Sequence, residues 1–167
     1  STISTNRLDR DEIERFIDKG VIGTRFLAKD HYRSLPEMEM YYRGEMNDFG
    51  LYDHDYKTID VDEKINVAKL IYNEFVDNRL ISAMSAIADM ETYNYIVDSN
   101  GFEGDNRRTL YMATAQVCVS GEGDERPEDY YYVNGQHWSK LEWKSVGVEA
   151  LNRAIRKIGA DRVDSGV

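Results

Sequence analysis

The sequence predicts an α+β fold in which three helices pack against an antiparallel β-meander of about four strands, as two layers. Three observations support this. Two segments start with the spacing of a capping box and carry apolar residues at helical intervals. The middle of the chain alternates apolar and other residues as strands do, and an Asn100-Gly101 pair separates two strand-like segments. Because strands follow one another without a helix between them, the pattern favours a meander and not a βαβ array.

The first predicted helix covers about residues 9–28. Asp9 and Glu12 have the capping-box spacing, in which each side chain satisfies a free backbone N–H group of the first turn. Gly20 and Gly23 weaken the helix, so we expect it to pack against a close neighbour. The stripe that we expect to be buried consists of Ile13, Phe16, Ile17 and Val21.

Two further helices are predicted over about residues 61–77 and 143–158. Asp60 and Glu63 repeat the capping-box spacing at the start of the first, and Gly159 follows the second where a C-terminal cap belongs. The expected inward residues are Val61, Ile65, Ala68, Tyr72, Phe75 and Val76 in one, and Val148, Leu151, Ala154, Ile155 and Ile158 in the other.

The predicted strands cover about residues 80–87, 93–97, 107–120 and 130–133. The strand over 107–120 is the longest. If it lies at an edge of the sheet, it could accept an extended peptide or a partner strand. The alternative is a strand that is paired on both sides.

An aromatic-rich segment without clear periodicity covers residues 31–58. Such a segment could line a ligand groove, or it could wrap the domain and bury its rings as a lid on the core. Its aromatic residues are Tyr32, Tyr41, Tyr42, Phe49, Tyr52 and Tyr56.

Composition excludes several functional classes. The chain has 167 residues and a net charge of −10, and phosphate backbones repel such a surface, so we expect no direct binding of nucleic acid. No apolar run approaches the roughly 20 residues of a membrane span, and no signal peptide is recognisable. The single Cys118 excludes an internal disulfide and fits a reducing, cytoplasmic compartment. It is interpreted as a small apolar strand residue, the alternative being a reactive nucleophile.

The charges are unevenly distributed. An acidic cluster follows the longest strand, and we interpret it as a solvated loop. Basic residues gather at the last turns of the final helix, where they complement the helix dipole. The acidic cluster is Glu122, Asp124, Glu125, Glu128 and Asp129, and the basic group is Arg153, Arg156, Lys157 and Arg162.

A search for catalytic, cofactor-binding and metal-ligating residues predicts none. His31, His54 and His137 do not form the paired spacing that places two zinc ligands on one helix face. Asp53-His54-Asp55 has residue types that bind metals, but adjacent side chains diverge, so a surface turn is the alternative. A further hypothesis is an unrecognised enzyme site in the aromatic segment, with His31, His54 and Tyr52 as its candidate residues.

Three segments carry a resemblance to a known family. Residues 95–104, Tyr-Ile-Val-Asp-Ser-Asn-Gly-Phe-Glu-Gly, resemble the strand and turn of the N-terminal domain in the TldD/PmbA family. Residues 146–160 resemble that family's helix with the pattern Val-Gly-x-Glu-Ala, Arg-Ala and Gly-Ala. Residues 1–6 resemble the end of the strand before its first helix. The order and spacing of the three pieces match the family, with the greatest likeness to PmbA-type (TldE-like) members.

The resemblance implies that residues 1–167 are part of the N-terminal domain of a longer cytoplasmic protein, without the first strands and without the C-terminal domain. Members of the family are metallopeptidases that mature peptides or degrade small unfolded proteins. They form dimers, so a homodimer or a TldD-like partner subunit is expected. Zinc would be held in the full-length protein or its partner, and this portion would serve as a non-catalytic scaffold. The alternative is an acidic module that modulates DNA gyrase, the activity for which the family was once named.

Overall fold

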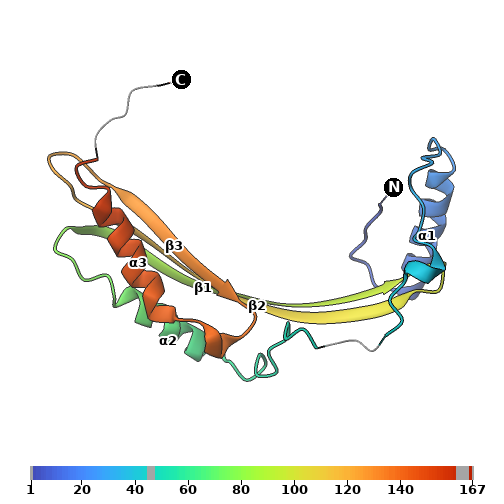
Figure 1. Cartoon of the computed structure of the whole chain (residues 1–167), viewed down its shortest axis with the longest axis horizontal. Helices are drawn as coiled ribbons and strands as arrows, with labels where there is room; N and C mark the ends of the chain where they lie inside the picture. Colours follow the sequence, from blue (N-terminus) through green and yellow to red (C-terminus); the bar gives the residue numbers. More distant parts are fainter. Residues whose placement is uncertain (1, 45–47, 161–165, 167) are drawn as a thin grey trace. The chain divides into compact units, whose positions relative to one another are not determined.

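The computed structural model describes residues 2–44, 48–160 and 166, which fall into two compact units, Ser1–Tyr42 and Arg43–Val167. The first unit holds helix α1 (Arg10–Thr24) and a short 3-10 helix η1 (Met38–Met40). The elements of the second unit are α2 (Val61–Tyr72), β1 (Leu80–Val97), β2 (Glu103–Val119), β3 (Glu128–Gly135), the 3-10 helix η2 (Trp138–Lys140) and α3 (Trp143–Arg156), as labelled in Figure 1.

The fold class is α+β as predicted, but the described sheet has three antiparallel strands in the order β1-β2-β3, fewer than the four expected. The predicted strands 80–87 and 93–97 are one continuous strand, β1, whose register with β2 runs from Ser82 opposite Cys118 to Val97 opposite Glu103. Between residues 87 and 93 the sequence does not alternate between apolar and polar residues as expected of a strand. The reason is that Asp89 faces the helix layer, where it pairs with Lys64 of α2. A charged residue at an inward position removed the signal of a strand.

The turn expected at Asn100-Gly101 joins β1 to β2. Gly101 adopts a positive φ of 87°, a conformation that residues with a Cβ rarely adopt. The Asp98 carboxylate accepts hydrogen bonds from the N–H groups of Asn100 and Phe102 and closes the turn. Gly159, after α3, also has a positive φ, as its predicted role as a cap requires.

Strand β2 is the central strand of the sheet in its second half. Residues 111–118 pair with β1 on one side and with β3 on the other, so for this part of 107–120 the alternative of a strand paired on both sides is confirmed. The physical reason is the acidic connection after β2, which turns the chain back so that β3 pairs along its second side. In the described sheet, β1 and β3 are the edge strands.

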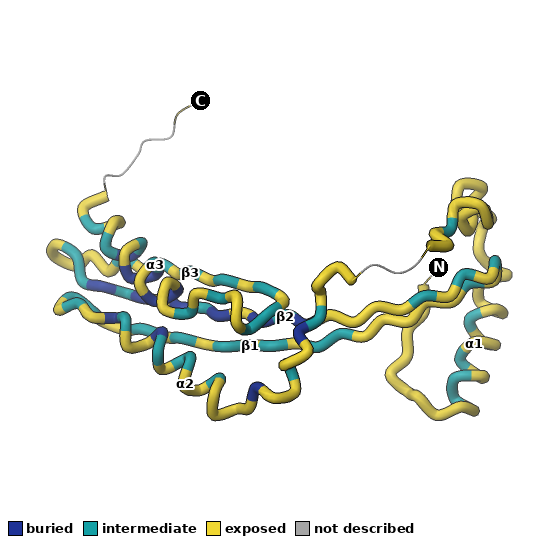
Figure 2. The backbone as a smooth tube through the Cα atoms, turned by 60° about the horizontal axis from the view of Figure 1, so that its bottom comes forward, coloured by how far each residue is buried: buried dark blue, intermediate teal, exposed yellow. Residues whose placement is uncertain are grey.

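Both helices of the second unit cover the same face of the sheet, with α2 over β1 and α3 over β2 and β3 (Figure 1). The core between them consists mostly of alanine and valine side chains, which allow the helices to approach the sheet closely. Buried positions follow β2 and the facing side of α3 (Figure 2). The core residues are Ile71, Phe75, Ala113, Ala115, Val117, Val119, Val146, Ala150, Leu151 and Ala154.

The predicted face of α2 is wrong for Val61 and Val76, whereas the expected Phe75 is buried. Ile71 is fully buried, whereas Val61 is 68% exposed and Val76, beyond the helix, is 83% exposed. The helix turns Lys64 toward the sheet because the carbon chain of the lysine covers apolar surface while its ammonium group reaches Asp89. In α3 the expected Leu151 and Ala154 are buried, but Val148 is exposed and Val146 and Ala150 take its place in the core.

The first unit confirms the predicted cap but not the predicted buried stripe. The Asp9 carboxylate accepts hydrogen bonds from the N–H groups of Asp11 and Glu12, and α1 begins at Arg10. No residue of α1 is buried, and Ile17 and Val21 are about half exposed. The side chain of Ile3 packs on the helix at Gly20, which is the close neighbour expected there. Residues 2–6, expected to end a strand, form no strand in the described chain, and Ser1 lies outside it.

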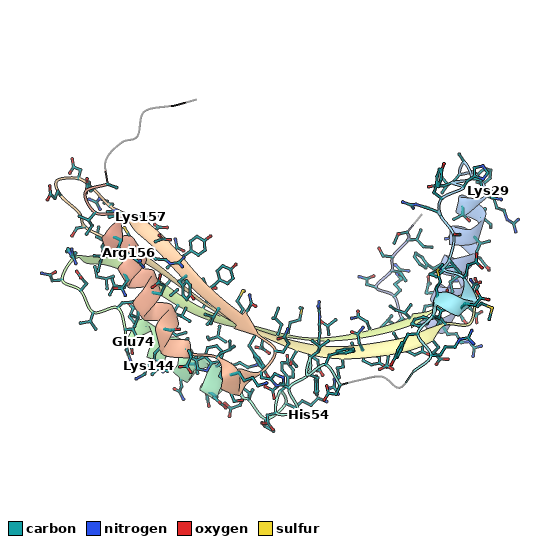
Figure 3. All side chains as sticks on the ribbon, in the orientation of Figure 1. Lys29, His54, Glu74, Lys144, Arg156 and Lys157 are labelled. Carbon is teal, nitrogen blue, oxygen red and sulfur yellow. The ribbon has the colours of Figure 1, made fainter. Side chains whose placement is uncertain are left out.

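The basic residues at the end of α3 are tied to specific acids. Arg153 and Arg156 both bond the carboxylate of Glu149, one turn and two turns earlier. The Lys157 ammonium bonds the carbonyl oxygen of Glu128 at 2.8 Å and the carboxylate of Asp129 at 3.0 Å, and it connects the helix to β3 (Figure 3). Arg162 lies outside the described residues. Among the described helices, none is both long and apolar enough to cross a membrane.

Candidate functional site

The buried polar residues of the described chain, Asp53 and Thr109, lie where the segment after residue 48 meets the sheet, at the point where β3 leaves β2. The last pair of the β2–β3 ladder is Tyr111 opposite Gly135. Two residues earlier in β2, the Thr109 N–H group donates to the carbonyl oxygen of Leu51 at 3.0 Å. The segment 51–53 therefore replaces β3 as the neighbour of β2 at this position. We call this region, residues 50–56, 109–111 and 136–138, the junction.

Thr109 holds the junction together through its buried hydroxyl group. Its Oγ1 donates to the carbonyl oxygen of Gln136 at 2.7 Å and accepts a hydrogen bond from the N–H group of Asp53 at 2.9 Å. One side chain thus connects β2, the end of β3 and the incoming segment. Burying a hydroxyl group costs free energy unless it both donates and accepts a hydrogen bond, as that of Thr109 does.

Asp53 is the one buried acidic residue among those described, with 7% of its surface exposed. Its Oδ2 accepts hydrogen bonds from the Trp138 N–H group at 2.9 Å and from the Tyr111 hydroxyl group at 3.2 Å. Its Oδ1 accepts from the Asp55 N–H group at 3.1 Å. Burial acts to raise the pKa of Asp53, but these hydrogen bonds and the charge of His137 outweigh it and lower the pKa.

Tyr111, the partner of Asp53, is fully buried. Burial raises the pKa of Tyr111, and the negative charge of Asp53 raises it further. Its ring packs edge-on to Trp138 at 5.3 Å and against Tyr56 at 5.9 Å. Trp138 in turn contacts Trp143, the first residue of α3, so the aromatic rings continue from the junction into the helix layer.

A second polar group joins the junction to α2. The Lys64 ammonium lies 2.8 Å from Oδ1 of Asp89, and the Tyr56 hydroxyl group donates to Oδ2 at 2.8 Å. The hydrogen bond to Asp89 raises the pKa of Tyr56 to about 12. Burial acts to raise the pKa of Asp89, but the hydrogen bonds from Lys64 and Tyr56 lower it. The carboxylate is therefore held charged between two donors.

An open hollow of about 280 Å³ lies beside the junction. The Arg107 guanidinium stacks on the ring of Tyr52 at 4.1 Å and pairs with Glu91 of β1. The hollow is lined by Asp48, Phe49, Leu51, Tyr52, Asp105, Asn106 and Arg107. The positive charge of Arg107 is already neutralised by Glu91. A ligand in the hollow would therefore find few unpaired groups to bind.

The aromatic segment 31–58 thus acts as a lid only in its last part. Tyr52 and Tyr56 cover Arg107 and Tyr111, whereas Phe49 is 72% exposed. Tyr32 belongs to the first unit and is fully exposed. The sequence offered the lid as one of two roles for the rings. It marked Asp53 only as a candidate metal ligand, and it gave Thr109 no role.

The candidate metal ligands do not converge. His54 is exposed and points away from the sheet at the outside of its loop (Figure 3), and its ring packs edge-on to Tyr52. His137 Nε2 lies 2.7 Å from the carbonyl oxygen of Gly50. His31 lies in the first unit and is exposed. In residues 2–44 and 48–160, no three His, Cys, Asp or Glu side chains are placed to hold a metal, and Asp53 is committed to backbone donors, so this donor set does not fit zinc.

The comparisons with known proteins agree with this architecture. The sequence profile of the PmbA/TldA metallopeptidase central domain matches residues 54–158. The resemblance predicts part of an N-terminal domain, whereas the matching profile describes the central domain. No curated protein matches the chain.

Two solved structures have the same fold. A Bacteroides thetaiotaomicron protein, described as a proposed modulator of DNA gyrase, is 42% identical, with a TM-score of 0.90 over 98% of this chain and 38% of its own. A Thermotoga maritima protein with the same description is 19% identical, with a TM-score of 0.74 over 97% of this chain and 36% of its own. The chain therefore spans less than two fifths of the length of these proteins. With a family profile that covers more than half of its residues, the chain belongs to the TldD/PmbA family.

Proposed function

We propose that the chain is a non-catalytic scaffold and assembly domain of a cytoplasmic TldD/PmbA-type metallopeptidase that matures peptides or degrades small unfolded proteins. The peptidase centre, with its zinc, would lie elsewhere in the full-length protein or in a TldD-like partner subunit. A homodimer or a complex with that subunit would enclose the substrate. The family match over residues 54–158 supports the class of the parent protein.

The observation that carries the non-catalytic role is the state of the junction. A general acid or base works best with a pKa near the operating pH. Here the pKa of Asp53 is lowered and that of Tyr111 is raised, so at neutral pH the first stays charged and the second stays neutral. Both side chains are also used in hydrogen bonds that hold the chain together. The cluster is built to fix a loop on a sheet, not to exchange protons.

The test is peptidase activity of the purified chain against fluorescently labelled casein, with and without added Zn²⁺. We expect no cleavage above that of buffer, and less than one zinc per ten chains after dialysis. Activity that copurifies with the chain, is lost in the Asp53→Asn variant and is removed by a chelator would contradict the proposal. The matched control is Asp105→Asn, an exposed acid on the same strand as Thr109.

A second candidate function is an acidic module that modulates DNA gyrase. The net charge of −10 and the description of the related Bacteroides protein favour it. It predicts that the chain inhibits supercoiling by purified gyrase at low salt and that the effect declines as salt screens the charges. Supercoiling that remains unchanged at a hundredfold molar excess of the chain would dispose of this function.

A further inference from the structure

The face of the sheet opposite α2 and α3 has no covering element among the described residues of the second unit, 43–44, 48–160 and 166; we call it the open face. Side chains alternate along a strand, so the residues of each strand that do not face the helices lie here. Met112 is 39% exposed, Met84 50%, Tyr132 51% and Tyr130 57%. The register places them in neighbouring rows: Met84, Gln116 and Tyr130; Ala86, Thr114 and Tyr132; Ala88, Met112 and Asn134.

The open face lacks charges over these rows and the next one, Met90 opposite Leu110. This is unusual in a chain in which 31% of the residues are charged. Charged side chains stand only at its two ends, with Glu128 beside Cys118 and Arg108 beyond Leu110. Loss of charge together with enrichment in tyrosine and methionine is typical of the centre of a protein interface.

The side chains of the open face suit an apolar partner. The rings of Tyr130 and Tyr132 stack at 6.5 Å and form a flat, rigid surface. Methionine side chains are flexible and polarisable, so Met84, Met90 and Met112 can adapt to different apolar shapes. Tyrosine adds a large contact area and a hydroxyl group that can remain at the wet rim.

The dimensions of the open face match one helix. Three strands about 4.8 Å apart give a width of roughly 10 Å between the outer two, close to the diameter of a helix. The seven residues from Met84 to Met90 extend about 20 Å, the length of roughly 13 helical residues. Helix α3, with 14 residues, covers the opposite face of the same strands. One helix of similar length would complete a second layer.

The charge of the chain indicates which helix would bind. A net charge of −10 attracts basic partners and repels acidic ones, while the neutral open face itself favours apolar contact. We propose that the open face binds an amphipathic helix of a partner polypeptide, with an apolar stripe of about four turns and lysine or arginine on its flanks. The proposal rests on this face and does not depend on the proposed function.

The test uses a fluorescein-labelled synthetic peptide of 14 residues, with leucine at positions 1, 4, 5, 8, 11 and 12 and lysine elsewhere, titrated by anisotropy with the 167-residue chain. We expect saturable binding that Tyr132→Glu weakens at least tenfold, although the added negative charge alone would favour a basic peptide. Met84→Glu should act in the same direction. The matched control is Tyr93→Glu, because Tyr93 is a similarly exposed strand tyrosine on the other face.

Three outcomes would overturn the proposal. Equal binding of a peptide with serine in place of leucine would show that charge alone attracts the peptide. Tighter binding of a peptide in which leucine and lysine alternate would show that the occupant is a strand. Unchanged affinity of the Tyr132→Glu and Met84→Glu variants, with thermal melts that match the unmodified chain, would place the binding elsewhere.

Discussion

Gly147 of α3 lies directly against the carbonyl oxygen of Ile71, the last buried residue of α2. A Cβ atom at position 147 would overlap that oxygen and would lie 3.0 Å from Cβ of Glu74. The two helices cross where one of them has no side chain, which lets Ile71 reach the core with none of its surface exposed. Backbone atoms cannot move aside as a flexible side chain can.

Gly147→Ala should therefore destabilise the chain by about 2 kcal/mol, because overpacking outweighs the gain in helix propensity. Urea unfolding followed by circular dichroism measures the change. The control is Gly23→Ala in α1, where a Cβ meets no atom within 4 Å. That variant should be neutral or gain up to about 1 kcal/mol. Equal stability of both variants would mean that α2 and α3 are not in close contact.

Replacing Asp53 by asparagine should cost about 2 kcal/mol of folding free energy. The amide group has one acceptor oxygen, and its NH2 group would face an N–H group or hydroxyl group that now donates to the carboxylate. Urea midpoints compare this variant with Asp105→Asn, which should change stability by less than about 0.5 kcal/mol. An equal loss of folding free energy in both variants would mean that Asp53 does not stabilise the junction more than an exposed acid does.

Stability should fall in acid through Asp53 and Asp89. Their pKa values are lowered in the folded chain, so the unfolded chain takes up protons first as the pH falls. The stabilisation is complete above the unfolded pKa of about 3.9 and is lost as the pH falls through the folded values. Urea midpoints at pH 7, 5, 4 and 3 test this. The Asp53→Asn variant should show a flatter decline below pH 4 than the unmodified chain.

Tyr56→Phe should cost about 1 kcal/mol, because Asp89 loses one of its two donors. The same bond predicts an alkaline effect. The folded pKa of Tyr56 is raised to about 12, so its contribution is complete below the unfolded value of about 10 and is lost as the pH rises toward 12. Thermal melts at pH 8, 9.5 and 10.5 compare the two proteins, and the variant should lose less stability across this range.

Hydrogen exchange should divide the β1–β2 hairpin into a slow part and a fast part. Residues 113–117 pair on both sides and lie in the core, whereas residues 93–97 belong to a two-stranded stretch with exposed side chains (Figure 2). An isolated two-stranded ribbon is only marginally stable in water. Exchange followed by mass spectrometry should show at least a hundredfold faster exchange at 93–97. Uniform protection along the hairpin would show that the ribbon is stabilised by another part of the protein.

The helices and their starts could be predicted because their signals are local. Asp9 and Asp60 both cap helices through backbone hydrogen bonds that require only a short side chain at the right position. The faces of the helices could not be predicted as reliably. In α2, apolar residues occur on more than one side. The salt bridge between Lys64 and Asp89, which are distant in sequence, fixes which side faces the sheet.

The junction was beyond the reach of sequence patterns for a similar reason. Thr109 and Asp53 are 56 positions apart, and their hydrogen bond depends on where β3 ends, which is a property of the pairing and not of either segment. The sequence marked Asp53 as a candidate metal ligand, and the structure places its carboxylate on backbone donors. The residue type of Asp53 indicated that it binds polar groups. Whether these are a metal or backbone N–H groups depends on how the strands pair.

Cys118 carries the only thiol of the chain. It lies half-buried in β2, directly opposite Glu128 of β3. Its Sγ lies 3.8 Å from the carbonyl oxygen of Arg126, near the end of the charge-free rows. A maleimide dye would therefore attach at one known position without any engineering. Its emission would report in real time whether water or protein lies against that side of the sheet.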